Sequence, residues 1–298
     1  MRVLSFADSA GRWRLAVADP GGVWRDVTSA ALGPDVVGNV VSPMRQFLLR
    51  HQRWASLASA AAAPDAEKAD IAVVLPPVPD PGKIVAAPVN YRDHQVEMSA
   101  TTAIDSLGVF LKAPSSLTAD GGPVRLPYHD RRFDQEGELA VIIGKRAHGV
   151  RREDALDHVA GYACLLDMTM RGGEDRSVRK SFDTFTPMGP YLVTPAEVGD
   201  LAELELRTWV DDHLRQDARL ADLIWDVPKL IVYVSSVMTL HPGDLIATGT
   251  PAGVGQVRDG QHITVEITRV GRLQVRVTSD GAVACPTQGQ GHGPVPPP

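Results

Sequence analysis

Apolar and polar residues alternate along this chain at two periods, one typical of strands and one typical of helices. In the first 30 residues, three short β-prone runs separated by turns predict a meander of strands at Val3–Phe6, Arg14–Val17 and Val23–Val27. Apolar residues then recur at helical spacing between Val36 and Ala63, which predicts one or two helices. The pattern therefore indicates a small N-terminal α+β module.

A proline-rich stretch separates this module from the rest of the chain. It runs from Pro64 to Lys83, contains five prolines and cannot hold regular structure throughout, so we expect a domain boundary within it. Beyond it, the helical pattern is limited to Tyr91–Met98 and Leu223–Thr239. The strands expected there are Glu138–Ile143, Ala160–Leu166, Leu204–Val210, Asp244–Thr248, His262–Ile267 and Leu273–Thr278.

These elements predict a mixed, β-rich α+β fold with a closed or curled sheet rather than a doubly wound one. We expect a small α+β domain over residues 1–75 and a larger domain over residues 76–286. Residues 287–298 are mostly Gly, Gln and Pro, which predicts a disordered tail.

Composition narrows the class of protein. The chain has 298 residues, of which 44% are hydrophobic and 22% charged, as in ordinary globular proteins. Its formal charge of -6 provides no basic surface for nucleic acid or anionic lipid, so we expect neither as a partner. No apolar run reaches the roughly 20 residues that a bilayer requires.

Cys164 and Cys285 lack metal-like or redox-motif spacing and are expected to be buried, reduced thiols. We therefore expect a cytoplasmic protein.

Acidic residues mark the ends of two predicted strands. Asp134, Glu136 and Glu138 are spaced two apart, which puts them on one face of an extended chain, and an apolar strand follows at once. Asp167 ends a second apolar run. Carboxylates at strand ends can converge on one hard cation, such as Mg²⁺, Mn²⁺ or Ca²⁺. The alternatives are a solvated strand edge and an aspartate that opens a loop.

Basic residues and one histidine add candidate chemistry. His94 and Glu97 are three residues apart, so on a helix the carboxylate can orient the imidazole as a general base. Lys112 and Lys180 can offer positive charge to an anionic substrate or an enolate, and Arg171 can clamp a carboxylate. Each also has an ordinary explanation: a surface His–Glu pair, lysines that reach solvent, and a loop arginine.

Five segments, in this order along the chain, resemble signatures of the fumarylacetoacetate hydrolase family. The resemblance covers about residues 81 to 284. The segments are Lys83–Glu97 with Asn-Tyr-x-x-His-x-x-Glu, Asp134–Lys145 with Asp-x-Glu-x-Glu-Leu, Val159–Asp167, Lys180–Pro190 and the glycine-rich Leu240–Gly255.

The resemblance implies a β-roll catalytic domain behind a smaller N-terminal domain, usually in a homodimer. By matching position, His94 with Glu97 would activate water and Lys180 would stabilise a leaving carbanion. Arg171 and Thr250 match substrate-binding positions. The implied metal ligands for Mg²⁺ or Mn²⁺ are Glu136, Glu138 and Asp167, and the further substrate-binding candidates are Tyr91, Lys112 and Glu174.

The implied activity is metal-dependent hydrolysis of a C–C bond in an acylpyruvate or a related 1,3-dicarbonyl (2,4-dioxo) acid. The alternative is a decarboxylase or isomerase of a 2-oxo or 2-hydroxydienoic diacid, of the 2-hydroxyhepta-2,4-diene-1,7-dioate isomerase type, on the same scaffold. A third alternative is a non-enzymatic carboxylate-binding protein, which the retention of every metal carboxylate disfavours.

One departure from the family pattern bears on the substrate. Many relatives have Arg-Asp-x-Gln where this chain has Arg171-Gly-Gly-Glu174, so an acid replaces a neutral amide. An anion there would repel a substrate carboxylate unless Arg171 or Arg176 pairs with it, and we therefore hypothesise an acyl group less acidic than fumaryl.

Overall fold

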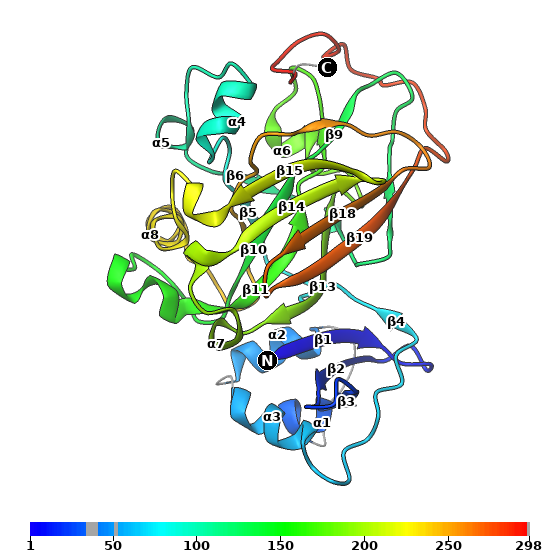
Figure 1. Ribbon diagram of the computed structural model, residues 1–298, viewed down its shortest axis with the longest axis vertical. Helices are drawn as coiled ribbons and strands as arrows, with labels where there is room; N and C mark the ends of the chain where they lie inside the picture. Colours follow the sequence, from blue (N-terminus) through cyan, green and yellow to red (C-terminus); the bar gives the residue numbers. More distant parts are fainter. Residues whose placement is uncertain (34–40, 51–52, 297–298) are drawn as a thin grey trace.

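The computed structural model describes residues 1–33, 41–50 and 53–296. Figure 1 shows a larger strand-rich body with a smaller group of strands and helices below it. This smaller group contains the predicted meander β1 (Arg2–Ala7), β2 (Trp13–Ala18) and β3 (Trp24–Asp26). Its helices are α1 (Thr28–Leu32), α2 (Pro43–Leu49) and α3 (Trp54–Ala61). The parts of the predicted helical region at residues 36–40 and 51–52 lie outside the described residues.

The largest sheet links the N-terminal strands to the rest of the chain. Within the described residues it has eleven strands, in the main order β3-β2-β1-β13-β11-β10-β16-β5-β6. The ends of this order do not pair with each other, so the sheet is open and not closed. The bounds of its other strands are β4 (Val73–Val74), β5 (Ile84–Ala86), β6 (Phe110–Lys112), β7 (Leu117–Thr118), β10 (Gly137–Ile143), β11 (Val159–Leu166), β13 (Thr186–Val193) and β16 (Leu245–Ala247).

A second sheet covers one face of the first. Its order is β15-β14-β18-β19-β8, and its strands are β8 (Pro123–Arg125), β14 (Glu205–Val210), β15 (His213–Arg219), β18 (His262–Ile267) and β19 (Gly271–Thr278). Burial alternates along β14 and β19, as expected for a sheet with one face in the core.

Strand β10 is buried on both faces and separates two hydrophobic cores. Leu139 and Val141 belong to the core under the second sheet, whereas Ala140 and Ile142 belong to the core shared with the N-terminal group. A strand buried on both faces is held firmly in register, because a slip of one residue would exchange its two faces. The acidic residues at its start are therefore fixed in place.

A small sheet lies beside the start of this strand, and short helices and 3₁₀ turns lie around the larger sheets. A three-stranded sheet has the order β12-β9-β17, with β9 (Phe133–Gln135), β12 (Thr169–Met170) and β17 (Gly255–Gln256). The helices are α4 (Arg92–Glu97), α5 (Ile104–Leu107), α6 (Arg176–Arg179), α7 (Pro195–Val198) and α8 (Val227–Val237). The 3₁₀ turns are η1 (Pro114–Ser116), η2 (Arg152–His158), η3 (Leu201–Glu203) and η4 (Leu220–Asp222). No helix of the described residues has the length and apolar character to cross a membrane.

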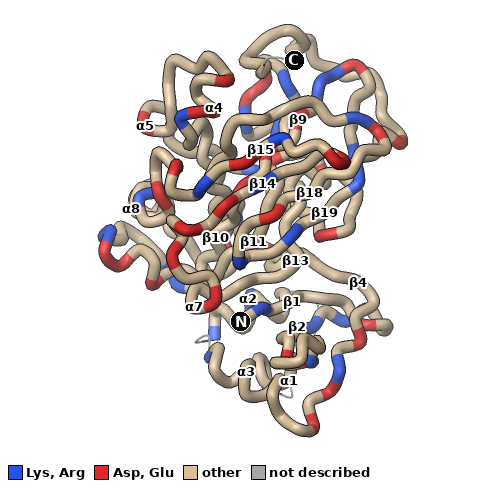
Figure 2. The backbone as a smooth tube through the Cα atoms, viewed as in Figure 1, with Lys and Arg blue, Asp and Glu red and all other residues tan. Residues whose placement is uncertain are grey.

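Charged residues of both signs are interspersed along the tube in Figure 2. Cys164 is buried, but Cys285 is half-buried and lies beside Arg131, so its expected full burial was wrong. The C-terminal segment, predicted as a disordered tail, is described as far as Pro296, and its Thr287 hydroxyl donates a hydrogen bond to Glu174.

Candidate active site

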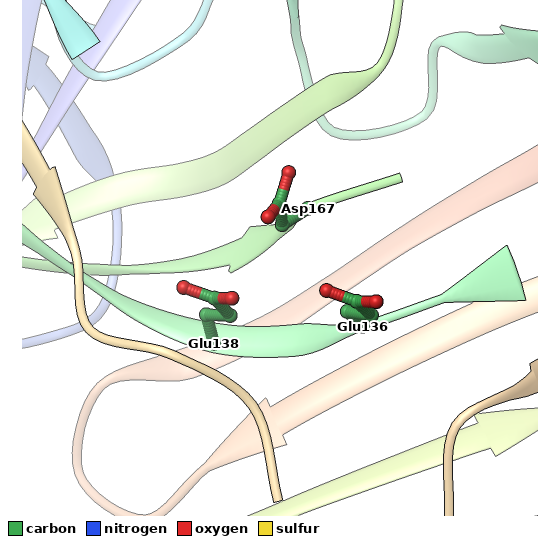
Figure 3. A group of neighbouring side chains, drawn as sticks. All are labelled: Glu136, Glu138 and Asp167. Atoms are coloured by element: carbon green, nitrogen blue, oxygen red, sulfur yellow. The ribbon is translucent and has the colours of Figure 1, made fainter. Parts of the chain in front are cut away.

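Three carboxylates meet where strands β10 and β11 reach the same edge. Glu136 lies in the break between β9 and β10, Glu138 is the second residue of β10, and Asp167 directly follows β11. The antiparallel register pairs Gly137 with Leu166, and the Asp167 amide donates a 2.8 Å hydrogen bond to the Glu136 carbonyl. One oxygen of each carboxylate lies within 4.8 Å of the others, and all three side chains are buried (Figure 3).

Two buried lysines neutralise part of this charge. The Lys180 ammonium donates a 2.6 Å hydrogen bond to Glu136 and another to Asp167. Lys112 donates to the other oxygen of Asp167 and, at 2.9 Å, to the Phe185 carbonyl. Neither lysine reaches solvent, which rules out the ordinary explanation of these residues as surface lysines.

Arg171 joins the cluster to a fourth carboxylate. Its Nη2 donates to Glu136 at 2.8 Å and its Nε donates to Asp134 at 2.7 Å. Asp134 also accepts a 2.8 Å hydrogen bond from Arg132. Asp134 therefore faces arginines and is not a member of the three-carboxylate group.

Glu138 is the least neutralised member of the group. Burial raises the pKa of its carboxyl well above the ordinary range, and the negative charge of Asp167 raises it further. Burial raises the pKa of Glu136 as well, but the positive charges of Lys180 and Arg171 lower it by more and hold it below its ordinary value. In the described chain, Glu138 accepts a 2.7 Å hydrogen bond from the Gly249 amide and forms no ion pair with Lys or Arg.

The three carboxylates fit a divalent metal ion. A buried carboxylate without a cationic partner is costly, and a cation between the three groups would remove that cost. An all-oxygen donor set suits hard ions such as Mg²⁺, Mn²⁺ or Ca²⁺ better than zinc. The candidate metal centre is therefore supported by the unpaired carboxylate of Glu138 as well as by the spacing of the ligands.

A histidine–glutamate pair stands beside the carboxylates. His94 Nδ1 lies 2.9 Å from Glu97 Oε2, as the three-residue spacing on a helix predicted. The Gly253 amide donates a 2.8 Å hydrogen bond to the other oxygen of Glu97 and so fixes the carboxylate. When the Nδ1–H group of His94 donates this hydrogen bond to Glu97, Nε2 carries no proton and can accept one.

One cavity of about 260 Å³ connects these groups. Of the predicted site residues, its walls contain His94, Glu136, Glu138, Arg171, Lys180 and Thr250. The Thr250 hydroxyl is held in place by two hydrogen bonds, one donated to the Gly137 carbonyl at 2.9 Å and one accepted from Gln216 at 2.7 Å. Asp167 and Glu97 lie directly behind the wall, each in contact with a lining residue.

Three predicted substrate-binding residues do not line the cavity. Lys112 lies behind Asp167, and Tyr91 is buried with a hydroxyl that has no hydrogen-bond partner among the described residues. Glu174 is clamped by Arg131 through two 2.8 Å hydrogen bonds. Neither Arg171 nor Arg176 pairs with Glu174; its partner is Arg131, on a loop 43 residues earlier in the chain.

The pairing of Glu174 removes the basis for expecting a less acidic acyl group. Hydrogen bonding to Arg131 lowers the pKa of Glu174 to about 2, so the carboxylate is charged but neutralised by its partner. It also accepts a hydrogen bond from the Thr287 hydroxyl in the C-terminal segment. Glu174 thus links this segment to the body of the protein.

Sequence reasoning missed several cavity residues. Arg176 and Arg179 of helix α6 line it, as do the apolar side chains of Met98, Leu107 and Phe110. Pro294 of the C-terminal segment closes one side. The only sequence signal for the arginines was their spacing of three residues, which puts both on one face of a helical turn.

Comparisons with known proteins show which sequences the chain resembles. The family model described as fumarylacetoacetate (FAA) hydrolase C-terminal matches residues 83–278. A maleylpyruvate hydrolase from Aquipseudomonas alcaligenes is 46% identical over 217 residues, which are 69% of this chain and 76% of the relative. A 4-hydroxyphenylacetate degradation bifunctional isomerase/decarboxylase from Escherichia coli is 42% identical over 211 residues, 69% of this chain but 49% of the relative.

A solved structure extends the similarity to the N-terminal group. The maleylpyruvate hydrolase from Sphingobium sp. SYK-6, crystallised with manganese(II) and pyruvate, superimposes with a TM-score of 0.79 at 40% identity. The match covers 94% of this chain and 99% of that chain.

Proposed function

Because this chain belongs to the fumarylacetoacetate hydrolase family, we propose that it hydrolyses a C–C bond of an acylpyruvate with the help of a divalent metal ion. The observation that carries the proposal is the single cavity that joins three buried carboxylates to the His94–Glu97 pair. The similarity to maleylpyruvate hydrolases, one of them crystallised with manganese(II) and pyruvate, supports the same reaction class.

Glu136, Glu138 and Asp167 would hold the ion, for which we propose Mg²⁺, with Mn²⁺ and Ca²⁺ as alternatives. When bound, the ion polarises a substrate carbonyl and offsets the negative charge that develops on oxygen. Lys112 and Lys180 act on the ligands themselves, because each holds an oxygen of Asp167 and so fixes its orientation.

His94 acts as the general base in this proposal. Its Nε2 takes a proton from water, and the resulting hydroxide attacks the distal carbonyl of the 1,3-dicarbonyl acid. Glu97 accepts the Nδ1 hydrogen bond and stabilises the imidazolium that forms. The Gly253 amide keeps Glu97 in the required orientation throughout.

Lys180 stabilises the leaving group. When the tetrahedral intermediate collapses, the C–C bond breaks and its electron pair stays on the pyruvate fragment as an enolate. The Lys180 ammonium lines the cavity and offers positive charge to this enolate, which then takes the proton held by His94 and becomes pyruvate. Arg171 and Thr250 are proposed to contact the substrate, since both line the same cavity.

A second candidate function is decarboxylation or isomerisation of a 2-oxo or 2-hydroxydienoic diacid. The observation that favours it is the 42% identity to the Escherichia coli isomerase/decarboxylase. An isomerisation does not require water activated for attack, so the intact His94–Glu97 pair favours the hydrolase.

Product analysis distinguishes the two candidates. Purified protein with Mg²⁺ is mixed with acetylpyruvate, fumarylpyruvate and oxaloacetate, while enol absorbance and products are followed. The hydrolase yields pyruvate plus the free acid, and both EDTA and His94→Ala abolish this product. Carbon dioxide, or loss of the enol without cleavage, would replace the proposal with the second candidate.

We also propose that the protein is a homodimer, as the family resemblance implies. Sedimentation velocity measures this directly, and a single species with the mass of one chain, 32.0 kDa, would contradict it.

A further inference from the structure

The C-terminal segment, residues 287–296, reaches the cavity from outside the region that the family model matches, which ends at residue 278. Pro294 lines the cavity and is itself exposed, so it lies at the rim where the cavity meets solvent. Figure 1 shows this end of the chain beside α6 and β9, on the side of the larger body away from the N-terminal group. The rim of the site therefore contains a residue that the matched family region does not supply.

The segment is fixed on both sides of Pro294. Before it, the Thr287 hydroxyl donates a hydrogen bond to Glu174. After it, Pro296 is buried, and its carbonyl accepts a 3.3 Å hydrogen bond from Arg132. Pro294 is therefore held against the cavity from both directions along the chain.

Glycines on both partners let the segment approach the body closely. Gly293 has a φ of +82°, and a Cβ at this residue would lie 2.4 Å from the Gly172 carbonyl oxygen. A Cβ at Gly173 would lie 3.0 Å from the Cβ of His292. Apart from its own chain neighbours, that Cβ would meet only His292 within 4 Å in the described part of the chain. The Gly172–Gly173 pair thus leaves room for the C-terminal segment and for little else.

This contact coincides with the departure from the family pattern. Where many relatives have Arg-Asp-x-Gln, this chain has Gly172 in place of the aspartate and Glu174 in place of the glutamine. Gly172 leaves space for the segment, and Glu174 binds it through Thr287. Neither Gly172 nor Glu174 lines the cavity. Both replacements therefore bear on the segment rather than on direct contact with a substrate.

The small size of the cavity gives its rim a role in selection. A volume of about 260 Å³ is at or below the lower end for ligand pockets, so a bulky ligand extends to the rim. Under the proposed function, the oxo-acid end of the substrate lies at the metal-binding carboxylates, and the acyl arm extends away from them. A proline ring at the rim cannot rotate aside as a flexible side chain does, and forcing extra volume against a fixed wall is costly.

We propose that the C-terminal segment selects among acylpyruvates, with Pro294 limiting the bulk of the acyl group that the cavity accepts. This inference rests on the proposed function and deepens it. Small or narrow acyl groups are preferred, and bulky aromatic acyl groups are disfavoured as long as the segment is held in place.

Two substrates that differ in acyl bulk test the inference. Acetylpyruvate has a methyl group where benzoylpyruvate has a phenyl ring. Because the two compounds differ in intrinsic reactivity, the decisive quantity is the change in their kcat/KM ratio between wild type and variant. Pro294→Gly removes the ring at the rim, and Gly173→Val displaces the segment through His292. Each variant should shift the ratio toward benzoylpyruvate by about 10-fold.

The control variant is Gln290→Gly, because Gln290 is exposed in the same segment and does not line the cavity. It should keep the wild-type ratio. A segment that only stabilised the fold would change both rates alike and leave the ratio unchanged in every variant. Unchanged ratios in Pro294→Gly and Gly173→Val would therefore overturn the inference.

Amide hydrogen exchange provides a readout that needs neither metal nor activity. Residues 287–296 should exchange faster in metal-free Gly173→Val than in wild type, because the added side chain collides with the segment. If the segment keeps its protection in this variant, Pro294→Gly alone decides.

A binding measurement separates failure of this inference from failure of the proposed function. If no acylpyruvate is cleaved, calorimetry of the metal-loaded protein with acetylpyruvate and benzoylpyruvate tests the segment alone. Tighter binding of acetylpyruvate that is lost in Pro294→Gly would support the role of the segment, while the hydrolase proposal fails. Cleavage with the same ratio in all variants would leave the hydrolase and overturn the inference. Binding of neither compound would overturn both.

Discussion

At the scale of single residues, Glu138 has the most unusual environment of the candidate site. Its carboxyl is buried and close to Asp167, and both effects raise its pKa. Because the folded-state pKa exceeds the unfolded value, the Glu138 carboxyl destabilises the metal-free fold at neutral pH. That penalty declines as the pH falls through the raised pKa toward the ordinary value of 4.5.

Replacing Glu138 by Gln should therefore have opposite effects on the metal-free and metal-loaded protein. Without metal, Glu138→Gln should melt at a higher temperature than wild type at pH 7, and the difference should shrink as the pH is lowered toward 4.5. With Mg²⁺, the variant should bind the ion about 10- to 100-fold more weakly, since one ligand charge is lost. Thermal melts and calorimetric titration measure these effects, with the exposed Glu153→Gln as the control. Lower stability of metal-free Glu138→Gln at neutral pH would contradict this account.

Glu97 offers a second test at the same scale. Glu97→Gln can still hydrogen-bond to His94, but it lacks the negative charge that stabilises the imidazolium. We expect kcat to fall roughly 10- to 100-fold, less than the roughly 100- to 10,000-fold loss for His94→Ala, because general-base catalysis itself has that magnitude. The double variant should be no slower than His94→Ala alone, since Glu97 acts through the histidine. Additive losses in the double variant would show that Glu97 has an independent role.

The sequence predicted the site residues whose partners lie nearby in the chain. It missed the contacts between residues that lie far apart in the chain. The two-residue spacing of Glu136 and Glu138, and the three-residue spacing of His94 and Glu97, follow from strand and helix geometry. The partner of Glu174 did not follow from any period, because Arg131 lies on a separate loop. The burial of Arg179 was equally hidden, since it depends on what packs over α6.

At the scale of elements, strands with an alternating pattern or an uninterrupted apolar run were predicted well, and strands interrupted by proline were not. His262–Ile267 was predicted with its observed bounds, and Glu138–Ile143 differs from β10 by one residue. Strand β13 (Thr186–Val193) was missed, because Pro187 and Pro190 argue against a central strand. Its ladder with β11 is irregular, with a register shift between Tyr162 and Cys164, so fewer regular hydrogen bonds are required of it.

The C-terminal segment gives a prediction at this scale. Besides the bond from Thr287 to Glu174, the Gly173 amide donates to the Gly289 carbonyl at 3.2 Å, and Arg132 donates to the Pro296 carbonyl at 3.3 Å. Glu174→Gln should release residues 287–296 and speed their amide hydrogen exchange, because the charge-assisted contact is lost. The exchange rates of strand β10 should stay unchanged.

The tether that Glu174 forms with the C-terminal segment should weaken at low pH. Hydrogen bonding to Arg131 lowers the pKa of Glu174 from 4.5 to about 2, so the tether is complete above pH 4.5 and is lost as the pH falls toward 2. The protection of residues 287–296, measured as exchange relative to the intrinsic rate at each pH, should fall over that range in wild type and remain low at every pH in Glu174→Gln. Equal protection of the segment in both proteins at pH 7 would show that Glu174 does not hold it.

At the scale of the whole molecule, local patterns indicated the elements but not how they combine. The N-terminal meander was predicted as part of a separate domain, and that division over residues 1–75 and 76–286 stays a prediction. Strand β1 nevertheless pairs with β13, with Arg2 opposite Val193, so the meander joins the large sheet. Pairing between residues almost 200 positions apart depends on tertiary packing, and the local spacing of apolar residues cannot predict it.

Metal binding should stabilise the whole fold, since the unfolded chain has no preformed cluster of three carboxylates. A ligand that binds only the folded state at 100 times its Kd adds about 2.7 kcal/mol of stability. Saturating Mg²⁺ or Mn²⁺ should therefore raise Tm by several degrees relative to EDTA-treated protein, and the shift should grow with ion concentration. Glu136→Gln should lose most of the shift, whereas Glu153→Gln should keep it. A Tm that does not respond to any of these ions would contradict the metal site. It would mean that Lys112, Lys180 and Arg171 alone balance the charge of the three carboxylates. The proposal of a metal-dependent hydrolase would then fail as well.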